Sequence, residues 1–213
     1  MSVTLWDWSR FKGGNVALKL NKRDLPELDQ VIALTPGRTA VVQAGGNLGI
    51  WPKRLAESFK TVYTFEPAAD LFAVVQVNAP EKNIIKFQAA LGERHELVSV
   101  ARIRRDGKPR PAHEGVTHIT GPGVIPTLRV DDLSLPVCDL LMLDLEGWEL
   151  YALRGARETI MRCRPVLCVE VNDHIREVGL TPEDVRNFLS GCGYRQHLRF
   201  VADDVWVPAE WPA

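Results

Sequence analysis

Short apolar runs rich in β-branched residues alternate along this chain with segments whose apolar residues recur every three or four positions. The first pattern predicts buried strands, and the second predicts helices that pack by one face. We expect strands at residues 39–44, 60–65, 83–89, 96–102, 137–143 and 165–171. We expect helices at residues 24–34, 52–59, 70–78, 147–161 (bent near Gly155) and 181–191. This alternation predicts an α/β fold with a mainly parallel central sheet and helices on both faces.

The remaining segments complete the predicted organisation. Residues 194–200 and 204–207 predict an antiparallel hairpin near the C-terminus. Residues 1–35 carry several aromatic side chains and are expected to cap the domain or to bind substrate. Residues 103–126 are rich in glycine, proline and charge, and we expect a long loop there, of a kind that is usually functional or disordered. The length suits one domain over residues 1–213.

Composition narrows the classes of protein. A net charge of −1 provides no overall attraction to nucleic acid or to an acidic membrane surface. No apolar stretch approaches the ~20 residues that span a bilayer, and the N-terminus lacks the apolar core of a signal peptide. The four cysteines form no CxxC pair, and we expect buried, reduced thiols. These features predict a cytoplasmic protein without a membrane span.

A glycine-rich run follows the first predicted strand. The residues GGNLG at 45–49 precede a helix, and the next strand ends at Glu66. Glycines let a ligand approach the backbone, a helix start offers N–H groups to an anion, and an acid at this strand end can accept both hydrogen bonds of a ribose diol. The dinucleotide fingerprint GxGxxG fails because Asn47 and Ile50 occupy its last two glycine positions. The layout is therefore that of enzymes that use S-adenosylmethionine (SAM); the alternative is a tight turn beside a surface glutamate.

Acidic residues also follow two later strands, where ligands of such sheets bind. Asp144 and Glu146 end the run LMLDLEG, and residues two apart on a strand point the same way. Asp144 could orient the amine of the cofactor, bind the acceptor or act as a base. Glu146 could do the last two, or instead cap the following helix. Glu170 ends the next strand, and His174, four residues further on, can accept a proton near neutral pH.

Two more histidines and a metal site are further possibilities. His113 and His118 fall in the predicted long loop and could reach the cleft only if that loop folds over it. Asp144, Glu146 and Asp173 offer the oxygen ligands that magnesium prefers. The chain shows no dedicated metal-binding spacing, so we expect no metal.

Six short motifs, in this order, resemble the FkbM family of SAM-dependent methyltransferases. They are GGNLG (45–49), FEP (65–67), AALGE (89–93), LRVDDL (128–133), LMLDLEGWELYALRGA (141–156) and RPVLCVE (164–170). The resemblance covers about residues 39–171, and LDLEG followed by RGA is its most specific part. It implies a Rossmann-like class I methyltransferase fold, SAM as methyl donor with S-adenosylhomocysteine as product, and most often a hydroxyl acceptor on a sugar or natural product.

The strand ends and the resemblance together define the predicted site. The predicted catalytic residues are Asp144, Glu146 and His174. The predicted cofactor-binding residues are Gln43, Gly45, Asn47, Gly49, Glu66, Pro67, Gln88, Ala89 and Asp144. Gln43 departs from the family pattern, which has an aspartate there that helps to hold the methionine amine. An amide gives up the charge attraction, and a charged hydrogen bond is about twice as strong as a neutral one.

Two other functions stay open. The segment RIRRDGKPR at 102–110 contains five basic residues that could contact phosphate, as in a ribose or other nucleic-acid methyltransferase. Amino-group methyltransferases of DNA usually carry a PPY-like tetrapeptide where this chain has DLEG, which argues against base methylation. A SAM-binding module without turnover is the other alternative, and Gln43 is its only support. We expect a small-molecule or glycan acceptor rather than nucleic acid; the sequence predicts neither its identity nor the oligomeric state.

Overall fold

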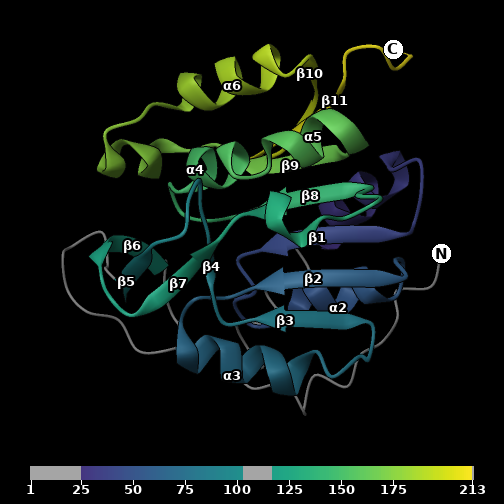
Figure 1. The fold of residues 1–213 in the computed structure, drawn as a ribbon. Helices are drawn as coiled ribbons and strands as arrows, with labels where there is room; N and C mark the ends of the chain where they lie inside the picture. Colours follow the sequence, from purple (N-terminus) through teal and green to yellow (C-terminus); the bar gives the residue numbers. More distant parts are fainter. Residues whose placement is uncertain (1–24, 103–116, 213) are drawn as a thin grey trace.

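The structure is a computed structural model that describes residues 25–102 and 117–212. A seven-stranded sheet forms its centre (Figure 1). The strand order is β3 (Ile84–Phe87), β2 (Thr61–Phe65), β1 (Ala40–Ala44), β8 (Leu140–Leu143), β9 (Val166–Glu170), β11 (Asp203–Pro208) and β10 (Tyr194–Arg199). The first five strands are parallel, and β11 is antiparallel to both of its neighbours. The predicted sheet and hairpin are confirmed.

Helices cover both faces of this sheet (Figure 1). They are a helix over residues 25–34, α2 (Ile50–Ala56), α3 (Ala69–Asn78), α4 (Glu149–Arg154), α5 (Arg157–Cys163) and α6 (Pro182–Gly191). Strand side chains alternate between the faces. Val42 and Leu141 pack in one cluster with Leu153 of α4, whereas Val41 packs in another with Leu55 of α2. The resulting core has two layers, one on each side of the sheet.

The structure explains two features predicted from the sequence, the start of the helix near Thr181 and the bend near Gly155. Thr181 and Asp184 form a capping box at the start of α6, with Pro182 in its first turn. Gly155 separates α4 from α5, so the expected bend is a break between two helices. A Cβ on Gly155 would overlap the carbonyl oxygen of Gly92, so this backbone approach requires glycine.

A second, smaller sheet corrects the prediction of a loop over residues 103–126. Its four strands are β4 (Ala90–Leu91), β7 (Ile125–Leu128), β5 (Leu97–Arg102) and β6 (Thr117–Pro122), in that order. Strands thus begin again at residue 117, while residues 103–116 lie outside the described part. The strands are short, partly exposed and joined by a turn at 123–124, so they show little apolar alternation. Figure 1 shows this sheet beside the carboxyl ends of β1 and β2.

Two predictions from composition concern free cysteines and membrane-spanning segments. All four cysteines are free; Cys163 is half-buried and the other three are buried. Within the described ranges, no helix combines the length and the hydropathy that crossing a bilayer requires.

Candidate active site

The glycine loop between β1 and α2 is shaped by contacts within the protein. Gly45 has φ +94°, and a Cβ there would overlap the carbonyl oxygen of Asp144. Gly49 has φ +79°, and its Cβ would lie 3.3 Å from the Cβ of Asn78 on α3. The hypothesis that these glycines make room for a ligand is therefore incomplete, because the protein itself fills that space. Gly45 nevertheless lines a pocket, whereas Gly49 does not.

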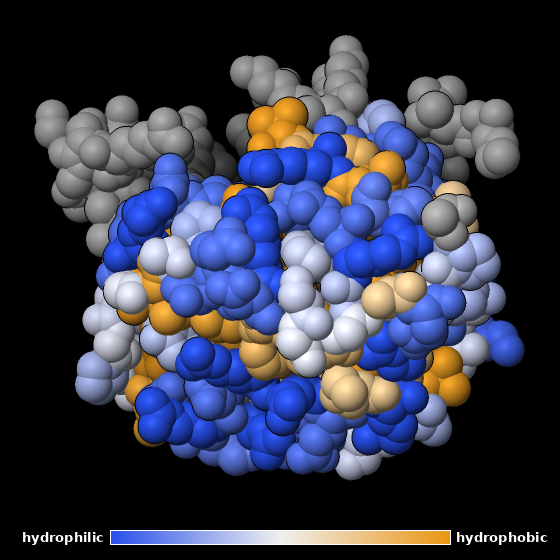
Figure 2. Space-filling view, turned by 90° about the horizontal axis from the view of Figure 1, so that it is seen from above, coloured by the Kyte–Doolittle hydropathy of each residue, from blue (hydrophilic) through white to orange (hydrophobic). Residues whose placement is uncertain are grey.

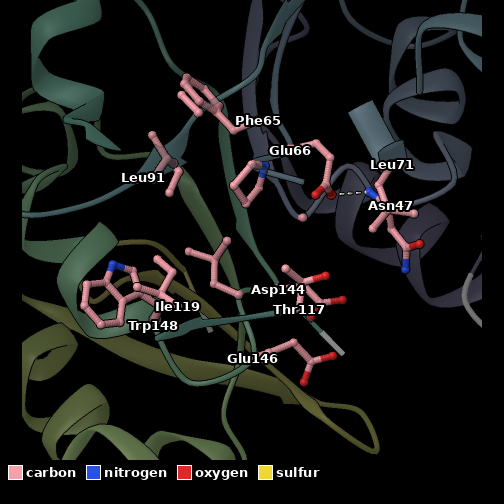
Figure 3. Close-up of a pocket in the computed structure, with 15 residues that line it drawn as sticks. Asn47, Phe65, Glu66, Leu71, Leu91, Thr117, Ile119, Asp144, Glu146 and Trp148 are labelled. Atoms are coloured by element: carbon pink, nitrogen blue, oxygen red, sulfur yellow. Dashed lines mark hydrogen bonds between the residues drawn. The ribbon is translucent and has the colours of Figure 1, made fainter. Parts of the chain in front are cut away.

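Glu66 links this loop to the connection that follows β2. The residue is buried, and its Oε2 accepts a hydrogen bond from the N–H of Asn47 at 2.8 Å (Figure 3). Its Oε1 accepts a second from the N–H of Ala68 at 2.9 Å. The acid predicted to bind a ribose thus also fixes two backbone segments beside the pocket.

Gln43 lies behind the pocket and is fully buried. Its Nε2 donates to the carbonyl of Gly45 at 2.9 Å, and its Oε1 accepts from the hydroxyl of Thr64 at 2.6 Å. Both ends of the amide are therefore engaged within the protein. Gln43, which departs from the family pattern, therefore holds the glycine loop through Gly45 and does not line the pocket.

The pocket opens between the carboxyl edge of the large sheet and the small sheet, and encloses about 620 Å³ including open solvent. The lining residues are Gly45, Asn47, Phe65, Glu66, Pro67, Leu71, Ala89, Ala90, Leu91, Thr117, Ile119, Asp144, Leu145, Glu146 and Trp148 (Figure 3). Seven predicted site residues are among them; Gln43, Gly49, the exposed Gln88 and His174 are not.

Sequence reasoning missed much of the pocket wall. Thr117 and Ile119 come from β6, which the sequence assigned to a loop. Trp148 stacks on Tyr151 with ring centroids 4.2 Å apart. The Nε1 of Trp148 and the Oγ1 of Thr117 are buried and have no hydrogen-bond partner in the described structure. Because a buried polar atom is costly unless paired, these two atoms are candidates for hydrogen bonds to a ligand.

A turn with unusual backbone geometry brings His174 to Glu146. Glu146 has φ +54° and Gly147 has φ +102°. A Cβ on Gly147 would lie 2.7 Å from the carbonyl oxygen of His174, so only glycine allows η3 (Asp173–Val178) to approach this closely. His174 Nδ1 lies 2.7 Å from Glu146 Oε2, and Asn172 accepts from the His174 N–H at 2.8 Å.

Glu149, rather than Glu146, caps the turn before α4. Its carboxylate accepts hydrogen bonds from the N–H groups of Leu145 at 2.8 Å and Gly147 at 3.1 Å. The alternative that Glu146 serves as the helix cap is therefore wrong. Burial raises the pKa of Glu149 to about 8, although the backbone N–H groups act to lower it.

The acids at the ends of β8 and β9 strongly influence one another. Burial raises the pKa of Glu146 to about 8, and the charges of Asp144 and Glu177 add to the shift. Burial raises the pKa of Glu170 to about 11, with Asp144 and Glu146 as the largest charge contributions. One potential ligand atom from each of Glu146, Glu170 and His174 lies within 4.8 Å of the other two. Burial and mutual repulsion therefore disfavour the ionisation of both carboxyl groups.

The small sheet contributes a second histidine, while a predicted acid points away. His118 on β6 lies edge-on to His174, with ring centroids 5.5 Å apart, and its Nδ1 is 3.4 Å from Glu177 Oε2. Burial lowers the pKa of His118. His118 therefore lies beside His174 although neither residue lines the pocket, and His113 lies outside the described residues. Asp173 is exposed and pairs with Arg176, so the suggested magnesium ligand set does not form.

A strand-end pocket with a glycine loop, a buried acid on the second strand and the LDLEG turn suits a methyltransferase, and the comparisons decide the family. The sequence matches the model of the methyltransferase FkbM domain over residues 44–196. The chain belongs to the FkbM methyltransferase family. No curated protein matches it closely enough to be reported.

Solved structures share the fold of this member of the FkbM family. The FkbM methyltransferase of Methylobacillus flagellatus KT superposes with a TM-score of 0.50 at 18% identity, covering 93% of this chain and 56% of that one. The chain therefore spans little more than half of that protein. The precorrin 8w decarboxylase of Methanobacterium thermoautotrophicum gives 0.50 at 11% identity, covering 86% and 89% of the two chains. A SAM-dependent methyltransferase of Aquifex aeolicus gives 0.49 at 14%, covering 95% and 98%. The fold is that of class I methyltransferases.

Proposed function

We propose that this chain binds SAM in the pocket and transfers the methyl group to a hydroxyl of a small-molecule or glycan acceptor. The observation that carries the proposal is the placement of Glu66, a buried acid that lines the pocket and is held by the glycine loop. Membership of the FkbM family supports methyl transfer. The finer assignment to an oxygen acceptor rests on the acids and histidine at the other end of the pocket.

The described residues fit the two ends of such a cofactor. Glu66 lines the pocket and would accept hydrogen bonds from the ribose hydroxyls through its carboxylate. Pro67 and Ala89 lie beside it in the lining and offer apolar surface to a flat base. Asp144 would pair with the methionine amine, a charge-assisted contact. Bound SAM supplies an electrophilic methyl group on a positively charged sulfur.

Glu146 and His174 would act on the acceptor. In Figure 3, Asp144 lies between Glu66 and Glu146 in the wall of the pocket. Because the pKa of Glu146 is raised to about 8, its ionised carboxylate is a stronger proton acceptor than an ordinary glutamate and predominates above that pH. His174 Nδ1 holds the same carboxyl group in place. A positioned base typically adds ~10²–10⁴-fold to the rate, and alignment of the reactants adds more.

The structure weakens the support for a SAM-binding module without turnover. That alternative rests on Gln43 alone, and the Gln43 amide is bonded to Gly45 and Thr64 outside the pocket lining. A change at this position therefore removes no group from the surface that a ligand would touch. The alternative of nucleic-acid methylation rests on the basic segment 102–110, which lies almost wholly outside the described residues. No observation on the described residues favours that alternative.

The proposal is tested by transfer of label from methyl-tritiated SAM. The purified chain is incubated with pooled hydroxylated acceptors: monosaccharides, oligosaccharides, phenols and, as the rival class, RNA. The account predicts label in a hydroxyl-containing small molecule or glycan, and much less label with Glu66→Ala when SAM is kept below the raised Kd of that variant. Label in RNA alone would contradict the acceptor class.

A further inference from the structure

Three side chains from two strand ends and a short helix meet beside the pocket. Glu146 follows β8, Glu170 is the last residue of β9, and His174 lies in η3. One oxygen or nitrogen atom from each lies within 4.8 Å of the other two. Strands β8 and β9 pair in parallel with Leu143 opposite Val169, so the acids that follow or end these strands lie at the same edge of the sheet.

The donor set and spacing match a metal site. Two carboxylates and an imidazole are ligands that Zn²⁺ accepts together, and carboxylates also suit Mn²⁺. Three ligand atoms bound ~2.1 Å from one tetrahedral ion lie ~3.4 Å from one another. Because the observed atoms lie within 4.8 Å of one another, binding an ion requires their separations to shorten by at most about 1.4 Å. Mg²⁺ and Ca²⁺ prefer all-oxygen sites and fit this set less well.

An independent observation points to a missing positive group. The Oε2 atom of Glu170 is buried and has no hydrogen-bond partner among the residues that the structure describes. No lysine or arginine of the described ranges forms an ion pair with Glu146 or Glu170, and the partner of Glu146 is His174. Buried carboxylates are usually paired or coordinate a metal. A cation at this point would satisfy the orphaned oxygen of Glu170.

Resting on the proposed function, we propose that Glu146, Glu170 and His174 bind one divalent transition-metal ion, Zn²⁺ or Mn²⁺, next to the methyl acceptor. Glu146 lines the pocket, so an ion on its carboxylate borders the space available to a substrate. A hydroxyl oxygen that binds such an ion becomes more acidic, and its proton leaves to solvent water. Glu146 and His174 then serve as ligands, and the ion replaces proton transfer to Glu146. Acceptors with an oxygen able to bind a metal are the substrate class that this site favours.

The test is ion binding by the full chain after removal of metals with a chelator. Mn²⁺ binding is followed by electron paramagnetic resonance and Zn²⁺ binding by calorimetry, for the parent chain and for Glu170→Gln. Glu170→Gln removes a charged ligand but keeps the shape of the side chain, and Glu170 is not in the pocket lining. Glu183→Gln, at an exposed position on α6, is the matched control. SAM binding is measured on the same samples to show that each variant retains its fold.

The proposal predicts saturable binding of about one ion per chain, weakened at least about tenfold by Glu170→Gln and unchanged by Glu183→Gln. It is overturned if the parent chain binds SAM but neither ion, or if Glu170→Gln binds the ion as tightly as the parent. Ion binding at this site without SAM binding contradicts the proposed function instead, so the two failures are distinguishable.

Discussion

The Oε2 atom of Glu66 lies 2.8 Å from the backbone nitrogen of Asn47, across the gap between the ends of β2 and β1. One carboxylate thereby fixes the glycine loop that borders the pocket, and its other oxygen fixes Ala68 at the start of the next connection. The residue that we propose to bind a ribose thus also joins two backbone segments. Loss of Glu66 should act on the ligand directly and through the loop.

Glu66→Ala should raise the Kd for SAM by about 10–100-fold, because hydrogen bonds to charged groups contribute about 1.5–3 kcal/mol. Glu66→Gln should not restore affinity, since an amide nitrogen would then face one of two N–H donors. Calorimetric titration checks both variants, with Glu183→Ala as the surface control. An unchanged Kd for Glu66→Ala would remove the ribose role.

Gly147→Ala should destabilise the fold more than Gly179→Ala. Both positions have positive φ, +102° and +77°, which costs a residue with a Cβ about 1–2 kcal/mol. Only at Gly147 would the new Cβ meet another group, the His174 carbonyl at 2.7 Å, whereas nothing lies within 4 Å at Gly179. Urea unfolding of both variants measures the difference, and equal losses would show that the close approach of η3 is not needed.

The stability of the fold should depend on pH through Glu149. Burial raises the pKa of this group to about 8 from an ordinary value of 4.5, so the folded state favours the protonated carboxyl. Its contribution is fully present below pH 4.5 and is lost as the pH rises through about 8. Glu149→Gln should therefore flatten the decline in unfolding free energy between pH 5 and 8. The exposed variant Glu158→Gln should keep the parent slope; a parent-like slope for Glu149→Gln would show that another group sets it.

Thr64→Val should reduce stability by about 1–3 kcal/mol, because it leaves the buried Oε1 of Gln43 without its donor. Thr61→Val, at a half-exposed position of the same strand, should be nearly neutral. Thermal and urea unfolding compare the two. Equal effects would mean that the Gln43 amide gains little from this hydrogen bond.

The large sheet could be predicted because its strands are apolar on both faces and its helices carry start signals such as Thr181-Pro182. In the small sheet, β5 was predicted as a strand over residues 96–102, but β6 and β7 were not, because they are largely half-exposed, pair with partners distant in sequence and are separated by a turn at 123–124. Strand propensity depends strongly on such context. As a result, the part of the pocket wall formed by Thr117 was missed.

The acids of the site could be located from their positions at strand ends, but their roles could not. Sequence spacing placed Asp144 and Glu146 at one strand end, while the left-handed conformation of Glu146 decides that its side chain meets His174. No side chain caps the start of α4 by a hydrogen bond, and Glu149 instead accepts hydrogen bonds from the turn before it. Gln43 looked like a cofactor ligand, and only the hydrogen bonds to Gly45 and Thr64 reveal its support of the loop.

Calorimetric titration of the purified chain with SAM and with S-adenosylhomocysteine tests the central claim most directly. The account predicts saturable binding of both at micromolar levels to one site per chain, with Gln43 in place. An absence of binding up to millimolar SAM, in a protein shown to be folded, would contradict it.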